Sequence, residues 1–461
     1  MKKLISIILV IFILVSCAAT AGAEVILSEV LRSETFTAKD GAVLPYRLHV
    51  PENYDAEKEY PVILFLHGAG NRGDDNLSPI SAHMVMMERI MGGETMEYEG
   101  KTVRICDEVI VIIPQCAKGM QWVDTPWGKQ PDPSYSLDEV AQSQYMTAVL
   151  ELLDDIKGKY NVNENKMYVT GLSMGGFGTW DIITRYPDMF AAAVPMGGAG
   201  DLARADVIKD IPIWTFHQYL DNTVSSLGTQ NIVKELVKVG GNIKFSGYFE
   251  YTHNAWKKGY AEEDLFTWLF AQSKDNRPAA KESIVLNAGE AFKGDIALLY
   301  ASGLMSDEYA AIYKNDITRQ QFCQALAPVL PDAENAIEPF EDTDNAEVAK
   351  AYALGIVNGV SATSFEPERN ITREEICTML SRAFIIMKAE VADGEELLFP
   401  DKDTISDWAE EAVKLVVSQK IVVGDENGNI NPKNNTTVEE ALAMIFRAHY
   451  AINTYGVIPE Q

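Results

Sequence analysis

Cysteine is scarce in this chain of 461 residues, which contains five, so a disulfide framework is not expected. Cys106 and Cys116 flank an expected strand at residues 108–114. Full extension would separate them by roughly 30 Å, and a disulfide allows only about 7 Å between Cα atoms. Cys323 and Cys377 take corresponding positions in two similar C-terminal segments and are expected to be buried. No cysteines and histidines are spaced as metal ligands are, so no metal site is predicted.

Positively charged residues are also few relative to negatively charged ones. The chain has 39 lysine and arginine residues against 67 aspartate and glutamate residues, which gives a formal net charge of −28. Binding to nucleic acid or to an anionic membrane surface requires clustered cations, because phosphates must be neutralised. The composition therefore argues against nucleic acid as a partner. The hydrophobic fraction of 47% is that of a folded globular protein, and the length indicates two or more domains.

Long apolar runs are missing from the chain except at its N-terminus, where Leu4 to Val15 follows two lysines. A bilayer span needs about 20 residues, so this shorter run predicts an export signal rather than a membrane helix. Cleavage after Ala23, in Ala-Gly-Ala, would remove a signal peptide of residues 1–23. Alternatively, Leu14-Val15-Ser16-Cys17 resembles a lipobox in which Cys17 is lipidated. Either reading predicts an exported protein.

Strand-like and helix-like segments alternate through residues 24–275, which predicts an α/β fold with a doubly wound, mostly parallel sheet. In proteins with such sheets, the substrate binds beyond the carboxyl ends of the strands. The expected strands are 44–50, 60–66, 109–113, 167–170, 191–195, 211–216 and 243–251, and the expected helices are 137–157, 176–186, 226–239 and 262–272. A linker, 276–283, separates this domain from a second region at 284–450.

Gly171-Leu172-Ser173-Met174-Gly175 stands between an expected strand and an expected helix. A serine between glycines at such a junction is a nucleophile elbow, in which the sharp turn forces the serine into strained backbone space. The glycines remove the Cβ atoms that would otherwise collide. Ser173 is therefore the candidate nucleophile.

A nucleophilic serine requires a base, and the base requires a carboxylate that orients it. His253 follows the last expected strand and is the candidate base. Asp221 follows the strand 211–216 and gives the chain order Ser, Asp, His that this architecture favours. Three other aspartates of the same interval, Asp201, Asp206 and Asp210, are in a loop or helix rather than at a strand exit. His217 is expected to be structural.

An oxyanion hole should combine the N–H of the residue after the nucleophile, Met174, with an N–H from a loop after an early strand. His67-Gly68-Ala69-Gly70 is such a loop. Ala69 is the candidate second donor, with Gly70 as the alternative. His67 is expected to hold the loop by hydrogen bonds.

These motifs together resemble the exported α/β-hydrolase esterases, a group also described as predicted peptidases and as similar to polyhydroxybutyrate depolymerases and feruloyl esterases. The resemblance covers residues 35–272 and rests on the oxyanion loop, the elbow and the motifs around Gln115, Trp122 and Trp256. It implies a cofactor-free serine esterase that acts on acyl groups of plant polysaccharide, with Gln115, Trp122 and Trp256 at the substrate. The family usually has His-Gly before the acid, whereas this chain has His217-Gln218.

The second region repeats with a period near 55 to 65 residues, which is typical of repeat architectures. The corresponding segments are Asp316-Ile-Thr-Arg319, Asn370-Ile-Thr-Arg373 and Asn435-Thr-Thr-Val438. In the second segment Thr372 is a favourable N-cap, and Glu375, three residues later, completes a capping box. The pattern predicts three units at 284–331, 340–389 and 399–450, each with a helix after its threonine.

These units resemble surface-layer homology (SLH) repeats, which form a mainly α-helical, pseudo-threefold module. The family binds exported proteins to secondary cell-wall polysaccharide, and the resemblance assigns the binding arginine of the motif to Arg319 and Arg373. A guanidinium group suits the carboxylate of a pyruvylated sugar. The third unit has Val438 at this position, and the first has Gln321 in place of the motif glutamate.

The sequence thus predicts an extracellular serine esterase that is held at a cell wall and needs no cofactor. Its expected partners are an ester-bearing polysaccharide or small ester and the wall polysaccharide. Two alternatives remain: an exported serine peptidase with the same triad, and a wall protein whose hydrolase domain only binds ligand.

Overall fold

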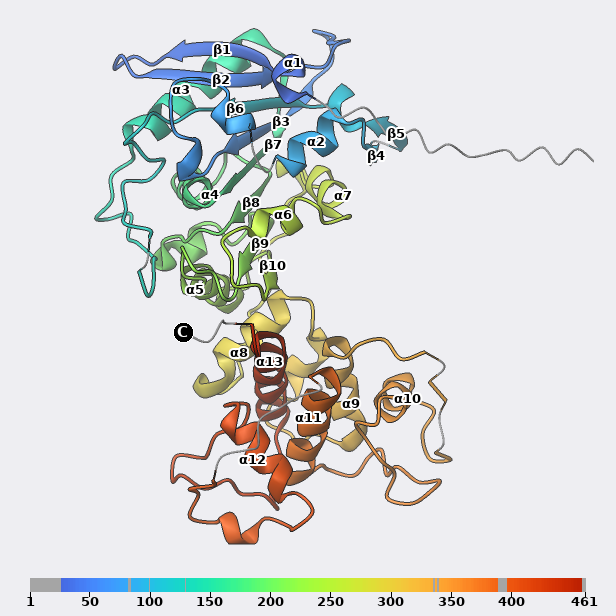
Figure 1. The fold of residues 1–461 in the computed structure, drawn as a ribbon. Helices are drawn as coiled ribbons and strands as arrows, with labels where there is room; N and C mark the ends of the chain where they lie inside the picture. The colour runs from blue at the N-terminus through green and yellow to red at the C-terminus, as the bar shows by residue number, and fades with distance from the viewer. Residues whose placement is uncertain are drawn as a thin grey trace, which may run out of the picture.

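The structure is a computed structural model that describes residues 26–81, 84–98, 100–128, 130–334, 336–337, 340–388 and 396–457. The expected signal peptide, its cleavage site and Cys17 lie outside the described residues. Figure 1 shows two parts stacked on one another: a sheet with helices on both faces, in blue to yellow-green, and a bundle of helices, in yellow to red.

The first part is organised by an eight-stranded sheet of the described residues, with the order β1-β2-β6-β3-β7-β8-β9-β10. Neighbouring strands from β6 to β10 run parallel, and β1 and β2 form an antiparallel edge. The strands are β1 (Arg32–Thr37), β2 (Val43–His49), β3 (Tyr60–Leu66), β6 (Ile110–Pro114), β7 (Val162–Leu172), β8 (Ala192–Met196), β9 (Ile213–Gln218) and β10 (Ile243–Tyr248). A separate hairpin pairs β4 (Thr95–Tyr98) with β5 (Lys101–Arg104).

Helices cover both faces of the sheet, because the side chains of its central strands alternate between two apolar clusters. Val62 and Leu64 of β3 belong to one cluster, and Ile63 and Phe65 belong to the other. The first cluster packs under α3 (Gln144–Lys159), α4 (Met174–Arg185) and α5 (Leu227–Lys238). The second packs under α1 (Leu27–Val30), α2 (Val85–Met91), α6 (Ala255–Gly259) and α7 (Leu265–Phe270). The α/β fold is therefore doubly wound, as the sequence predicts.

Three local features differ from the sequence prediction, and the first is that α3 begins at Gln144 rather than at residue 137. The edge strand β1 and the β4–β5 hairpin were not expected, since their residues are largely polar and lack the apolar runs of the central strands. Helix α4 begins at Met174, directly after Ser173, rather than at residue 176. In the part of the chain that the structure describes, no helix combines the length and apolar character needed to span a membrane.

The second part contains the helices α8 (Glu290–Ala301), α9 (Arg319–Leu326), α10 (Ala346–Ala353), α11 (Arg373–Met387), α12 (Glu410–Ser418) and α13 (Val438–Thr454). Thr318, Thr372 and Thr437 each close a capping box at the start of α9, α11 and α13. Three short bridges join the segments before these helices in a cycle: Asp316 with Thr437, Thr318 with Asn370, and Thr372 with Asn435. This cycle gives the region its pseudo-threefold arrangement.

The cysteines take the places expected of small apolar side chains. Cys323 and Cys377 are fully buried in the helical part, Cys116 is buried at the end of β6, and Cys106 is half-buried. All four are free thiols in the structure.

Candidate active site

Ser173 is the single residue between the end of β7 at Leu172 and the start of α4 at Met174. Its φ of 54° and ψ of −119° describe a strained backbone conformation, which residues other than glycine rarely adopt. The turn is tight enough that a Cβ at Gly171 would lie 2.3 Å from the oxygen of Gly175, and a Cβ at Gly175 would lie 1.9 Å from the oxygen of Leu66. Glycine is therefore required on both sides of the serine.

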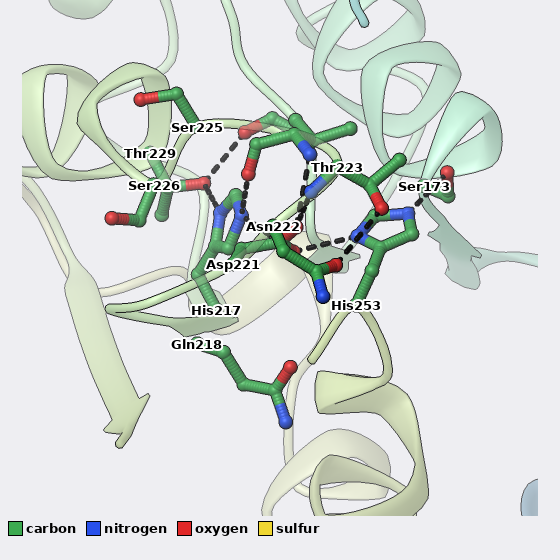
Figure 2. A network of polar contacts seen from close by, with 12 residues as sticks. Ser173, His217, Gln218, Asp221, Asn222, Thr223, Ser225, Ser226, Thr229 and His253 are labelled. Carbon is green, nitrogen blue, oxygen red and sulfur yellow. Dashed lines mark hydrogen bonds and ion pairs between the residues drawn. The ribbon is translucent and has the colours of Figure 1, made fainter. Parts of the chain in front are cut away.

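Three side chains from distant parts of the chain meet at this turn, as Figure 2 shows. The Nε2 of His253 lies 2.8 Å from the Oγ of Ser173. The Nδ1 of His253 lies 2.6 Å from Oδ2 of Asp221. Ser173 leaves β7, Asp221 follows β9 and His253 follows β10, so all three lie at the carboxyl edge of the parallel sheet.

The Asp221 side chain is only 1% exposed. Its Oδ1 accepts hydrogen bonds from the backbone N–H groups of Thr223 and Val224, at 2.8 and 2.9 Å. Burial raises the pKa of the Asp221 carboxyl, but hydrogen bonds from His217 and His253 outweigh burial and hold this pKa well below its usual range. The carboxylate is thus fixed and ionised beside His253.

Of the three competing aspartates, Asp206 is exposed and the other two bond to backbone groups away from His253. Asp201 accepts the N–H groups of Leu137 and Ala203, and Asp210 accepts the N–H of Ala280.

A second histidine, His217, supports the aspartate from its buried side. Its Nε2 lies 3.4 Å from Oδ2 of Asp221 and 3.2 Å from the carbonyl oxygen of Val224. Its Nδ1 lies 2.7 Å from the hydroxyl of Thr229, which in turn donates to the carbonyl of Gly198. His217 is fully buried, and its contacts agree with the structural role expected from the sequence.

Gln218 has a role that sequence reasoning missed. Its Oε1 accepts the Thr252 hydroxyl at 2.9 Å and the Asn254 N–H at 3.1 Å, and its Nε2 donates to Oδ1 of Asn254 at 2.8 Å. Thr252 and Asn254 are the two neighbours of His253, and Gln218 is 1% exposed. One buried amide therefore fixes both sides of the His253 loop. The only sequence feature that could have indicated this role is Gln218 itself, which stands where the family usually has the glycine of His-Gly.

The two expected oxyanion donors flank the serine. Met174 is the first residue of α4, and Ala69 begins a short 3₁₀ turn, Ala69–Asn71. A Cβ on Gly68 would lie 3.5 Å from the Cβ of Ser173, so the loop passes directly beside the nucleophile. Among the described residues, neither N–H is engaged in a hydrogen bond. Both can therefore donate to an oxyanion at Ser173.

His67 holds this loop, as expected. Its Nδ1 donates to the carbonyl of Gly68 at 2.7 Å, and its Nε2 accepts the N–H of Cys116 at 3.0 Å. This pattern is that of a neutral imidazole. Burial lowers the pKa of His67 to about 4, in agreement with the geometry.

Gln115 and Trp122, which the resemblance places at the substrate, form hydrogen bonds with the segment that carries the oxyanion loop. Both side chains are fully buried. The Gln115 amide accepts the N–H of Asn76 and donates to the carbonyl of Asn71, and the Trp122 indole donates to the carbonyl of His67. Both residues stabilise the segment that carries the oxyanion loop. A direct contact of either residue with the substrate stays a prediction.

Trp256 lies against the candidate base, with its ring edge-on to His253 at 5.0 Å between centroids. Its side chain is buried, and its Nε1 has no hydrogen-bond partner in the described residues. The chain after β6 comes to the same edge of the sheet, since Trp122 donates to the carbonyl of His67 and the carbonyl of Pro131 accepts a hydrogen bond from Ser225, near the acid. A hollow of about 490 Å³ on this segment is lined by Gln121, Asp124, Thr125, Pro126, Trp127 and Gly128.

The two arginines expected to bind polysaccharide occupy equivalent positions in the helical part. Arg319 lies 3.5 Å from Glu375, and Arg373 lies 3.0 Å from Glu440. In the threefold cycle the third equivalent pair is Val438 and Gln321. Both members of that pair are uncharged. The third site therefore lacks both the arginine and the glutamate that the other two sites have.

The two arginines differ in whether the Nε atom has a hydrogen-bond partner. Arg319 donates to the carbonyls of Phe365 and Asn358 and is 7% exposed. The Nε of Arg373 is buried without a partner, and the side chain borders a cavity of about 410 Å³. Asparagine and acidic side chains line much of this cavity: Asp425, Glu426, Asn429, Asn431, Asn434, Asn435 and Glu440.

Comparisons with known families agree with this division of the chain. Residues 41–280, somewhat more than half of the chain, match the family described as "Putative esterase". Residues 341–377 and 398–442 match the "S-layer homology domain". No group of side chains in the described residues is arranged to hold a metal ion.

Individual relatives are more distant. An endoglucanase of Bacillus sp. (strain KSM-635) is 33% identical over 136 residues, which are 28% of this chain and 14% of that protein. The bifunctional acetylxylan esterase/xylanase XynS20E of Neocallimastix patriciarum is 19% identical over 199 residues, 43% of this chain and 24% of that protein. The chain thus spans less than a quarter of each. A solved structure of a thermostable esterase is 31% identical, with a TM-score of 0.45, over 53% of this chain and 64% of that one.

Proposed function

We propose that this chain, which belongs to the "Putative esterase" family, is a carboxylic ester hydrolase in which Ser173, His253 and Asp221 carry out the reaction. The observation that supports this most directly is the pair of short contacts from one imidazole, 2.8 Å to the serine hydroxyl and 2.6 Å to the aspartate. A base within hydrogen-bond reach of a nucleophile, and itself oriented by a third group, is the arrangement that activates a serine.

In the first half of the reaction, the Oγ of Ser173 attacks the ester carbonyl while Nε2 of His253 takes the hydroxyl proton. Asp221 stabilises the imidazolium that forms and keeps Nδ1 protonated. The carbonyl oxygen becomes an anion between the N–H groups of Met174 and Ala69. His253 then returns the proton to the departing alcohol, which leaves an acyl group on Ser173. In the second half, water activated by His253 releases the acid. No step requires a cofactor.

The substrate class that we propose is an acetyl or feruloyl ester of a plant polysaccharide. Similarity to a protein named as an acetylxylan esterase/xylanase supports an acetylated polysaccharide. The hollow beside Trp127 provides an aromatic face at the same edge of the sheet, and such faces stack on sugars and phenolic acyl groups. Trp256, beside His253, is the candidate contact for the acyl group. Gln115 and Trp122 act by positioning the oxyanion loop.

The C-terminal SLH region associates the protein with a cell surface. We propose that it does so by binding secondary cell-wall polysaccharide through the grooves of Arg319 and Arg373. The boundaries that we propose are residues 1–23 for the signal peptide, 24–275 for the esterase domain, 276–283 for the linker and 284–450 for the three repeats. On this proposal the enzyme is exported and acts while held at the wall.

The direct test is turnover of 4-nitrophenyl acetate by the full chain and by Ser173→Ala. We expect a loss of at least about a thousandfold in kcat with an unchanged fold, because the nucleophile is removed. Ser225→Ala, which changes another serine near the same edge, serves as the matched control and should retain activity. Persistent turnover in Ser173→Ala would refute the assignment of the nucleophile.

The substrate class is tested separately with acetylated xylan, feruloyl esters and short peptides. Release of acetate or ferulate without peptide cleavage is expected. Faster cleavage of peptides than of esters would favour the peptidase, and no turnover of any substrate by the folded protein would favour a wall protein that only binds ligand.

A further inference from the structure

The esterase part and the helical part share one hydrophobic core. A single cluster of buried residues contains Tyr219, Val233, Val237 and Phe245 of the sheet part together with the core of the SLH region. In Figure 1, the yellow helix α8 and the dark red helix α13 lie directly beneath α5 and β10. The linker is also tied down, since the N–H of Lys281 donates to the carbonyl of Gly240 at 2.9 Å.

At the centre of this contact, aromatic rings of the two parts pack together. Tyr219 stacks on Phe249 at 4.9 Å and lies edge-on to Tyr450 of α13 at 5.3 Å. Phe249 in turn lies edge-on to His449 at 5.2 Å and to Tyr450 at 6.3 Å. Tyr219 is 8% exposed, and its hydroxyl is hydrogen-bonded to Ser302, at the end of α8.

These rings belong to the two loops that carry the catalytic acid and base. Tyr219 stands two residues before Asp221, and Phe249 stands four residues before His253. The Tyr219 N–H donates to the carbonyl of Tyr248 at 2.7 Å, so the roots of the two loops are also joined through their backbones. Helix α13 therefore supports both loops from the side opposite to Ser173.

We propose that His449 and Tyr450 of the SLH region are positioning residues for the esterase, so that the region which holds the protein at the wall also completes its active site. The proposal rests on the proposed function, since it takes Asp221 and His253 as the catalytic acid and base. Edge-on and stacked aromatic pairs stabilise a packed core beyond the area that they bury, and a buried ring that is truncated leaves a cavity into which its neighbours move. A shift of about 1 Å in a catalytic group can cost about a hundredfold in rate.

The test is kinetic and uses the full chain. In Tyr450→Ala we expect kcat for 4-nitrophenyl acetate to fall between about tenfold and a hundredfold, with KM within about twofold, because the loops move while the ester site remains. Tyr450→Phe keeps the ring and should restore the parent kcat. Tyr352→Ala is the matched control, since Tyr352 lies in α10 of the same region and contacts Phe340 rather than the esterase. A kcat of Tyr450→Ala within twofold of the parent would overturn the proposal.

Two further measurements keep the outcome decisive. Tyr450→Leu retains apolar volume without a ring and takes the place of Tyr450→Ala if that variant does not fold. Hydrogen exchange of the loops 219–226 and 249–254, measured in the same variants, reports positioning independently of turnover. Faster exchange in Tyr450→Leu than in Tyr450→Phe supports the proposal, and equal exchange contradicts it. A parent chain without turnover, or Ser173→Ala with turnover, would instead count against the proposed function.

Discussion

The indole Nε1 of Trp122 donates a 3.0 Å hydrogen bond to the backbone carbonyl of His67, across 55 residues of sequence. His67 begins the loop whose Gly68 lies beside Ser173 and whose Ala69 is the candidate oxyanion donor. The geometry of the oxyanion hole thus depends on a side chain that is itself fully buried. Positioning of this kind is visible in kcat rather than in KM.

Replacing Trp122 with phenylalanine should therefore slow the chemical step. A neutral hydrogen bond contributes about 0.5–1.5 kcal/mol, so we expect kcat to fall by about threefold to tenfold, with KM within about twofold. Kinetics with 4-nitrophenyl acetate measure both constants. Trp408→Phe is the control, because Trp408 is 59% exposed and lies in the helical part, away from the oxyanion loop. A rise in KM for feruloyl esters, with kcat unchanged, would instead indicate that Trp122 contacts the substrate.

Gln218 should likewise position the base, His253, through its bonds to the neighbouring residues. Gln218→Ala removes the hydrogen bonds to Thr252 and Asn254, so His253 loses the fixed position of both its neighbours. We expect kcat to fall by about tenfold or more, with KM nearly unchanged. The control is Asn222→Ala, an exposed residue on the neighbouring loop whose side chain donates to the Tyr251 carbonyl at 3.3 Å and accepts the Thr223 hydroxyl at 3.1 Å. A parent-like kcat for Gln218→Ala would show that the loop holds its shape unaided.

His67 should make the stability of the protein depend on pH. Because burial lowers its pKa in the folded state to about 4 from 6.5, only the unfolded chain binds a proton between these values. The free energy of unfolding therefore falls as the pH drops through this window, by about 3 kcal/mol from this group.

Urea unfolding of the parent and of His67→Gln at pH 7 and pH 4.5 measures this contribution. Glutamine can still accept the Cys116 N–H but does not titrate. The loss of stability on acidification should be smaller in the variant, though not absent, because burial also lowers the pKa of His449 to about 4. Equal losses in the two proteins would show that His67 is not the source.

The two arginines of the SLH region should behave differently when truncated. Arg373→Ala should abolish most of the sedimentation with isolated cell walls while the protein stays folded, since the side chain borders a cavity and the Val423 carbonyl that it bonds is exposed. Arg319→Ala should lower the free energy of unfolding by about 1–3 kcal/mol, because it leaves the buried carbonyl of Phe365 without its donor. Arg204→Ala, at the surface of the esterase part, is the control. Unchanged wall binding in Arg373→Ala would reject the polysaccharide groove.

The sequence predicted most of the central strands within a few residues, because a parallel sheet buried on both faces leaves continuous apolar runs. It did not predict the strands at the edge of the sheet and in the separate hairpin, and it placed the start of α3 seven residues too early. The strand β1 and the β4–β5 hairpin carry polar residues whose pairing depends on neighbours distant in the chain, and no local pattern reports such pairing.

By itself, the sequence determined the nucleophile elbow and the three repeats, since each depends on local spacing: glycines two residues from Ser173, and a threonine before each capped helix. Only the tertiary structure decided which polar side chains meet. It brings Asp221, rather than Asp201 or Asp210, to His253, turns Trp122 inward to the oxyanion loop, and sets Tyr450 beneath the acid and base loops. Those contacts join residues that are far apart in the chain, and their formation depends on how whole strands and helices pack rather than on any neighbouring residue.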